Sequence, residues 1–252
     1  MSNVSSIQVI NQSIDNITAD EALARVSEAI RSRHYLSIAT INPEIIVLSA
    51  RDKSYARILS KLNLRLPDGA GLTLISRYFG HAKFKERIPG VDFIGNLLVL
   101  AEKKNYKVMT LGAGVESARK AEINLRRRYP DMAVKCLSGG IIDPDNADRD
   151  IIFSIKSFKP DIIIVGLGAP KQEYFIANYQ KKLNIPVAIG AGGTIDFMAG
   201  IAHRAPAAMR SLGLEWLWRL ILYPKRWRRI TNAVFVFPWL YIRWRAGGKI
   251  WF

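Results

Sequence analysis

Residues 161–168 read Asp-Ile-Ile-Ile-Val-Gly-Leu-Gly, and this stretch decides the fold class. Its continuous apolar run, Ile162 to Val165, is typical of a strand that is buried on both faces. Strands of that kind belong to parallel sheets whose two faces are covered by helices. The glycines that follow would lie at the carboxyl end of the strand, where such sheets bind ligands.

The pattern repeats on both sides of this stretch. Further strands are expected at residues 36–40, 107–111, 133–137 and 186–190, and helices at residues 19–30, 43–62 and 116–128. Thr18 is the expected N-cap of the first helix, with Glu21 as its capping-box partner. This alternation predicts an α/β, Rossmann-like core over residues 1–200, with a mostly parallel sheet and helices on both faces.

Three predicted strand ends are rich in glycine, which lets main-chain N–H groups approach a phosphate closely. Residues 112–117 match a dinucleotide-binding fingerprint only in part, because Ser117 stands where the third glycine belongs. They therefore indicate nucleotide binding in general. The substrate-binding glycines predicted in this way are Gly112, Gly114, Gly166, Gly168, Gly192 and Gly193.

Residues 201–252 differ sharply in composition from the rest of the chain. They contain ten arginine or lysine residues, one acidic residue and all six tryptophans. Basic and aromatic residues together can bind nucleic acid or an anionic membrane. The apolar stretches 212–222 and 235–242 favour the membrane over nucleic acid and over a helix that merely packs on the core. We expect a basic, tryptophan-rich helical appendage whose removal leaves a folded core.

No apolar stretch reaches the roughly 18 residues that a membrane-spanning helix needs. The first residues lack the basic and apolar regions of a secretory signal, so none is expected. The single cysteine, Cys136, excludes an intramolecular disulfide and suits a reducing compartment.

Two acidic positions have competing interpretations. Asp143 and Asp145 could hold a divalent metal, but Pro144 suits a first helical turn, which favours Asp143 as a helix cap. The three histidines are scattered, so no catalytic metal and no cofactor are predicted. Asp68 lies at a strand-to-helix junction, where it is either a turn residue or a general base.

Seven motifs occur together in the order of one family. The chain resembles the bacterial WecG/TagA/CpsF glycosyltransferases over about residues 7–230. The motifs are Thr40–Glu44, Pro67–Gly71, Arg87–Asp92, Gly166–Glu173, Gly192–Asp196, Arg204–Pro206 and Gly213–Leu220.

This resemblance implies an inverting, metal-independent transfer from a UDP-sugar to an undecaprenyl-diphosphate-linked sugar. It implies a peripheral enzyme at the cytoplasmic face of the inner membrane, engaged in cell-surface polysaccharide synthesis. Asp68 matches the family's general base. Residues that match its active-site pocket are Thr40, Asn42, Arg87 and Gln172, and those that match its lipid-diphosphate site are Arg219, Arg226 and Arg229.

Some positions depart from the family pattern, among them Ala191, Ile195 and Tyr223. They leave the donor sugar open between N-acetylmannosamine, glucose and related sugars. The acceptor sugar, the polysaccharide pathway and the oligomeric state, monomer or homo-oligomer, are open as well. The alternative function is a non-catalytic nucleotide- or nucleic-acid-binding protein that uses the basic C-terminal face.

Overall fold

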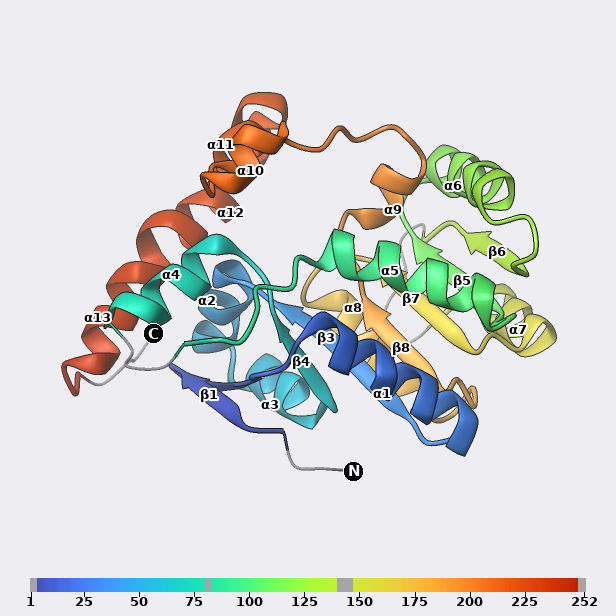
Figure 1. Cartoon of the computed structure of the whole chain (residues 1–252), viewed down its shortest axis with the longest axis horizontal. Coiled ribbons are helices and arrows are strands. Elements are labelled where there is room, and N and C mark those ends of the chain that lie inside the picture. The colour runs from blue at the N-terminus through green and yellow to red at the C-terminus, as the bar shows by residue number, and fades with distance from the viewer. Residues whose placement is uncertain (1–3, 80–82, 140–146, 249–252) are drawn as a thin grey trace.

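The computed structural model describes residues 4–79, 83–139 and 147–248, apart from the side chains of Ser211 and Arg226. A parallel sheet with the strand order β4-β3-β8-β7-β5-β6 forms its centre (Figure 1). The strands are β3 (Leu36–Ile41), β4 (Leu64–Pro67), β5 (Val108–Gly112), β6 (Val134–Leu137), β7 (Ile162–Gly166) and β8 (Val187–Gly190). The predicted α/β class is confirmed, and each predicted strand lies within one residue of its expected ends.

Strand β7 shows why the apolar run determines the fold. It pairs in parallel with β5 on one side and β8 on the other, so both of its edges are hydrogen-bonded. Ile163 and Val165 pack into the hydrophobic cluster on one face of the sheet, while Ile162 and Ile164 pack into the cluster on the other face. Alternate side chains of a strand point to opposite faces, so burial on both faces needs apolar residues throughout.

Helices cover both faces of the sheet, as predicted. One face carries α2 (Pro43–Arg51), α3 (Lys53–Lys61), α7 (Arg149–Phe158) and α8 (Lys171–Tyr179). The other carries α1 (Ala19–Ser32), α5 (Gly90–Lys103) and α6 (Val115–Arg128). Two shorter connections contain α4 (Ala70–Phe79) and α9 (Thr194–Met198).

Local signals predicted one helix correctly and another wrongly. The capping box of Thr18 and Glu21 is present at the start of α1. The single helix expected at residues 43–62 is instead two helices, α2 and α3, that meet at Asp52. The Asp52 carboxylate accepts hydrogen bonds from the N–H groups of Ser54 and Tyr55, over 2.8 and 3.0 Å. The short side chain of an aspartate can bond to nearby main-chain N–H groups, so it favours the start of a new helix over the continuation of the old one. The antiparallel hairpin β1 (Ser6–Val9) and β2 (Gln12–Asp15) was not predicted.

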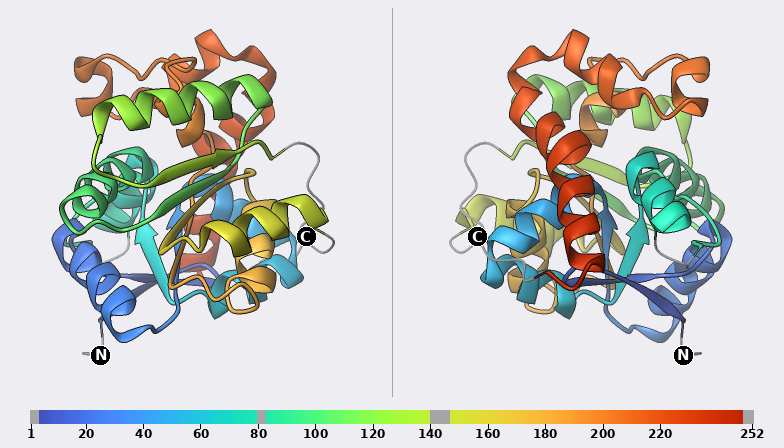
Figure 2. Two further views of the ribbon diagram at one scale, coloured as in Figure 1. Left: turned by 90° about the vertical axis from the view of Figure 1, so that its right-hand side faces the viewer. Right: turned by 90° about the vertical axis from the view of Figure 1, so that its left-hand side faces the viewer.

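The C-terminal segment is helical, as expected, and runs along one side of the core (Figure 2, right). It comprises α10 (Ala207–Ser211), α11 (Glu215–Leu222), the 3-10 turn η1 (Pro224–Arg226), α12 (Trp227–Thr231), the π-helical turn η2 (Asn232–Val236) and α13 (Phe237–Arg245). No helix within the described ranges is both long and apolar enough to cross a bilayer.

Helix α13 takes part in the core, which the expectation of a removable appendage did not include. It contacts α2 and α4. Its Phe237, Leu240 and Tyr241 are buried in the same hydrophobic cluster as Ile163 and Val165 of β7. Deleting residues 201–252 would therefore expose the surfaces of α2 and α4 that α13 covers, and a folded remainder stays a prediction.

Candidate active site

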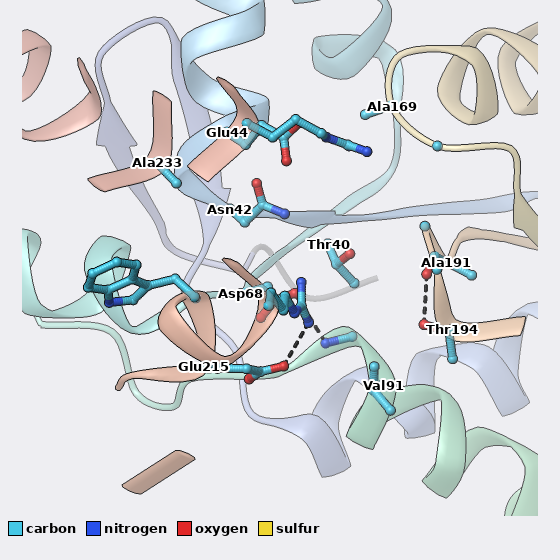
Figure 3. A pocket seen from close by; sticks show the side chains of 18 of the residues that line it. Thr40, Asn42, Glu44, Asp68, Val91, Ala169, Ala191, Thr194, Glu215 and Ala233 are labelled. Atoms are coloured by element: carbon cyan, nitrogen blue, oxygen red, sulfur yellow. Dashed lines mark hydrogen bonds and ion pairs between the residues drawn. The ribbon is translucent and has the colours of Figure 1, made fainter. Parts of the chain in front are cut away.

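A cavity of about 580 Å³ opens where the carboxyl ends of the strands meet the C-terminal helices (Figure 3). The chain segments that follow β4, β3, β8 and β7, four neighbours in the sheet, reach its wall. Residues of α11 and α12 supply another part of the wall. The predicted site residues that line it are Thr40, Asn42, Asp68, Arg87, Gly166, Gly168, Gln172, Gly192, Gly193, Arg219 and Arg229.

Asp68 follows β4 and supplies a carboxylate to this cavity. Its Oδ2 accepts a hydrogen bond from the N–H of Gly90 at the start of α5, over 3.3 Å. Burial raises the pKa of Asp68, although the Gly90 N–H, Arg219 and Arg87 act to lower it, and the charge of Glu215 adds to the rise. A carboxylate with a raised pKa is a stronger base than an exposed one. Asp68 is therefore suited to accept a proton from a substrate in the cavity.

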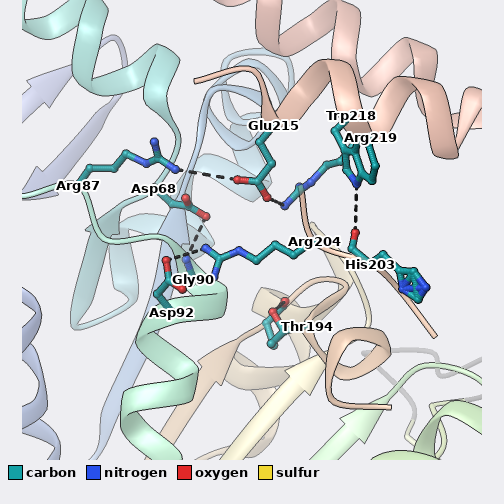
Figure 4. A network of polar contacts seen from close by, with 11 residues as sticks. Asp68, Arg87, Gly90, Asp92, Thr194, His203, Arg204, Glu215, Trp218 and Arg219 are labelled. Atoms are coloured by element: carbon teal, nitrogen blue, oxygen red, sulfur yellow. Dashed lines mark hydrogen bonds and ion pairs between the residues drawn. The ribbon is translucent and has the colours of Figure 1, made fainter. Parts of the chain in front are cut away.

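Two arginines beside Asp68 share one carboxylate (Figure 4). Glu215, the first residue of α11, lies with Oε1 2.7 Å from Nη2 of Arg219 and with Oε2 4.0 Å from Nη2 of Arg87. The contact joins the C-terminal segment to the loop before α5. Guanidinium groups hold phosphate oxygens in a fixed planar geometry, so this part of the wall is suited to a diphosphate.

A second ion pair braces the main chain next to Asp68. Nη2 of Arg204 lies 2.6 Å from Oδ2 of Asp92 in the first turn of α5, and Nη1 contacts the other carboxylate oxygen. The pair lowers the pKa of Asp92. It holds the loop after α9 against the start of α5, which presents the Gly90 N–H to Asp68 (Figure 4).

Thr40 and Asn42 lie at the end of β3 and have local contacts as well as a place in the cavity wall. A β-carbon at Gly90 would lie 3.2 Å from both Cγ2 and Oγ1 of Thr40, so glycine permits the close approach of α5. Oδ1 of Asn42 accepts the N–H of Ile45 over 3.0 Å and so caps α2. That hydrogen bond fixes the orientation of the Asn42 side chain at the edge of the cavity.

Of the predicted glycines, Gly112 and Gly114 are not among the described residues that line the cavity. A β-carbon at Gly112 would lie 2.6 Å from the main-chain carbonyl of Gly166, so this glycine allows the end of β5 to pack closely against β7. Gly114 is the N-cap of α6. A phosphate contact at either position stays a prediction.

Gln172 is almost fully buried, although it borders the cavity. Its Oε1 accepts the N–H of Gly192 over 2.9 Å, and its Nε2 donates to Glu173 over 2.6 Å. The carboxamide thus joins α8 to the glycine loop that follows β8.

The predicted arginines of the C-terminal segment occupy three successive elements. Arg219 lies in α11, and Arg229 lies in α12, where it forms an ion pair with Glu44 in the first turn of α2. Arg226 ends η1, and its side chain lies outside the described part of the structure. Arg219 and Arg229 place positive charge on the side of the cavity that the C-terminal helices form.

The proposed helix start at Asp143 and Asp145 lies outside the described residues. Helix α7 begins at Arg149, and its N-cap Asp148 accepts the N–H of Asp150 over 2.8 Å. Within the described ranges, no group of three or more His, Cys, Asp or Glu residues is arranged to hold a metal ion.

Sequence reasoning assigned no role to several residues that organise the site. The sequence motifs contain all four of these residues without indicating what they contact: Glu44, Asp92, Arg204 and Glu215. Arg229 and Glu44 are 185 positions apart in the chain, and Arg204 and Asp92 are 112 apart. No spacing rule reaches that far, so only the folded chain reveals these contacts.

Comparisons with known proteins identify the relatives of the chain. The family model for the glycosyl transferase WecG/TagA/CpsF family matches residues 7–250, which include α13. A Bacillus subtilis protein named N-acetylglucosaminyldiphosphoundecaprenol N-acetyl-beta-D-mannosaminyltransferase is 36% identical over 207 residues, 79% of each chain. A Staphylococcus aureus protein of the same name is 30% identical over 251 residues, 99% of this chain and 96% of its own.

Proposed function

Because this chain belongs to the WecG/TagA/CpsF family of glycosyltransferases, we propose that it transfers a hexosamine from a UDP-sugar to a polyprenyl-diphosphate-linked sugar. The names of the relatives favour N-acetylmannosamine as the sugar transferred and N-acetylglucosamine as the acceptor sugar. One observation carries the proposal: a half-buried carboxylate with a raised pKa, Asp68, shares a cavity with arginines of the C-terminal helices.

The proposed reaction is a single displacement that needs no metal. Asp68 takes the proton of the acceptor hydroxyl, and that oxygen attacks the anomeric carbon of the donor. The new glycosidic bond forms as the bond to UDP breaks, and attack from the opposite side inverts the anomeric configuration. The glycine loops that contain Gly168 and Gly193 line the cavity and would hold the UDP. Arginine in the cavity wall would balance the negative charge of the UDP.

Arg219 and Arg229 would bind the diphosphate of the acceptor, which places that substrate on the side of the C-terminal helices. Their present partners, Glu215 and Glu44, keep the guanidinium groups at the cavity wall. The acceptor hydroxyl would then point inward, toward Asp68.

The outer surface of the C-terminal helices supports a membrane location. Arginine side chains lie over the rings of Trp227 and Trp239, each 5.3 Å from the ring centroid, so cation and aromatic ring face solvent together. Such surfaces insert aromatic rings at the lipid interface and place arginine on anionic headgroups. We therefore propose peripheral binding at the cytoplasmic face. The exposed apolar residues of this surface are Leu212, Ile221, Leu222, Trp227, Phe235, Trp239 and Ile242.

The decisive experiment offers the purified protein a panel of UDP-sugars together with a short-chain polyprenyl-diphosphate-linked N-acetylglucosamine. UDP-N-acetylmannosamine is expected to be consumed with release of UDP, and Asp68→Asn is expected to lower kcat by about 10²–10⁴-fold while UDP binds within a few-fold of wild type. Turnover of Asp68→Asn at the wild-type rate would show that Asp68 is only a turn residue. Absence of turnover with every donor would contradict the proposed activity.

A further inference from the structure

A buried chain of hydrogen bonds leads from α3 through α8 to the glycine loop at the cavity. We propose that Glu173 and Tyr55 are positioning residues, which hold the Gln172 carboxamide in one orientation and thereby fix the loop of residues 190–193. The assignment of that loop to the UDP-sugar rests on the proposed function.

The chain has three links. The hydroxyl of Tyr55 donates to Oε2 of Glu173 over 3.1 Å. Nε2 of Gln172 donates to Oε1 of Glu173 over 2.6 Å. The N–H of Gly192 donates to Oε1 of Gln172 over 2.9 Å, and Gly192 has φ +53°, a conformation that glycine adopts readily.

Glu173 determines which way the carboxamide faces. A carboxylate oxygen accepts hydrogen bonds, so Glu173 attracts the NH₂ end of Gln172 and turns the carbonyl end toward Gly192. In the opposite orientation, the NH₂ group of Gln172 would face the N–H of Gly192, and two donors would meet. Without an acceptor at residue 173, the NH₂ group of Gln172 loses its partner, and only the Gly192 N–H still favours this orientation. The Gly192 N–H would then lose its partner in part of the molecules.

The packing around the carboxamide shows that the site is built closely around these groups. A β-carbon at Gly190 would lie 2.6 Å from Nε2 of Gln172 and 3.2 Å from Oε1 of Glu173, so only glycine leaves room for them. The side chains of Glu173 and Tyr55 are fully buried, at 0% and 1% exposure. Burial raises the pKa of Glu173 to about 7, which shows that holding this carboxyl group here is unfavourable for its charged form.

A carboxyl group at this position is therefore not explained by stability alone. An apolar side chain of similar size would avoid the cost of burying a polar group. What the apolar side chain could not do is accept the hydrogen bond from Gln172. The hydrogen-bonding pattern, more than the packing, accounts for a carboxyl group at residue 173.

Matched variants separate these two roles. Glu173→Gln keeps an acceptor for Gln172 and donates to the Tyr55 oxygen, whereas Glu173→Met keeps the volume and removes the acceptor. Glu173→Met is expected to raise the KM for the UDP-sugar by about tenfold, the effect of one lost hydrogen bond near 1.4 kcal/mol. Its kcat and its KM for the acceptor should stay near wild type. Glu173→Gln should restore the donor KM, and Tyr55→Phe should raise it about threefold, since only the outermost link is lost.

Hydrogen exchange of the Gly192 amide tests the same link without any substrate. Protection is expected to fall in Glu173→Met and to persist in Glu173→Gln. If wild type turns over no UDP-sugar, the proposed function fails while the exchange measurement still tests the positioning. Unchanged Gly192 protection in Glu173→Met would overturn the inference, as would equal damage to donor KM in the Gln and Met variants.

Discussion

Phe237 anchors the C-terminal segment, and its replacement measures how firmly that segment belongs to the core. Its side chain is fully buried at the start of α13, in the cluster that also contains Leu240 and Tyr241. Replacing a buried phenylalanine by alanine removes its contacts and leaves a cavity, at a typical cost of about 3–5 kcal/mol. Domains are stable by about 5–15 kcal/mol, so Phe237→Ala should lose a large share of the total.

Trp239 provides a matched control in the same helix. It lies two residues further on but is 52% exposed, so Trp239→Ala should change the free energy of unfolding by less than about 1 kcal/mol. Urea unfolding of both variants gives the midpoints and the slopes, and cosedimentation with anionic vesicles gives membrane binding. Trp239→Ala is expected to bind vesicles more weakly at unchanged stability, because the exposed ring would lie at the lipid interface.

A Phe237→Ala variant with the wild-type urea midpoint and slope would contradict the place of α13 in the core. Helix α13 would then be a loosely attached element, and the original expectation of a removable segment would stand. A Trp239→Ala variant as unstable as Phe237→Ala would contradict the reading of Trp239 as an exposed side chain that adds little to stability.

Three further outcomes test the charges of the site. Activity should survive EDTA, because arginines supply positive charge for the leaving diphosphate; loss on chelation and recovery with Mn²⁺ or Mg²⁺ would contradict this. The charge of Glu215 raises the pKa of Asp68, and a general base must be ionised to act. Glu215→Gln should therefore shift the acid limb of the kcat/KM profile to lower pH. An unchanged acid limb would show that Asp68 is not the group that titrates there. The double change Arg219→Ala and Arg229→Ala should lower catalysis far more than vesicle binding. Full activity on a water-soluble acceptor with lost vesicle binding would assign these arginines to lipid headgroups instead.

Local patterns predicted the core because its signals are local. The run Ile162 to Val165 needs no partner to be recognised as a doubly buried strand, and the Thr18 capping box lies within four residues. Asp52 shows the limit of such reasoning, since the apolar periodicity of residues 43–62 continues across it while its side chain starts a new helix. The period of a helix face does not reveal where one helix stops and the next begins.

The candidate site was predictable residue by residue but not as a network. Motif resemblance named Asp68, Arg87 and Arg219, and the fold brings all three to one cavity. Only one of the two contacts of Glu215 has a local signal: Arg219 lies four residues further on, whereas Arg87 lies far back in the chain. Gly112 was expected at the ligand; the lack of a side chain there also lets β5 pack closely against β7, and a phosphate contact stays a prediction.

The place of α13 in the chain also bears on how the protein is made. Every element against which α13 packs, including α2, α4 and the cluster around β7, precedes it and emerges earlier from the ribosome. Until α13 arrives, the surfaces of α2 and α4 that it covers stay exposed, whereas Arg219 and Arg229 of the cavity have already been added. The residues that line the cavity in the described structure are therefore all made before the helix that packs on α2 and α4.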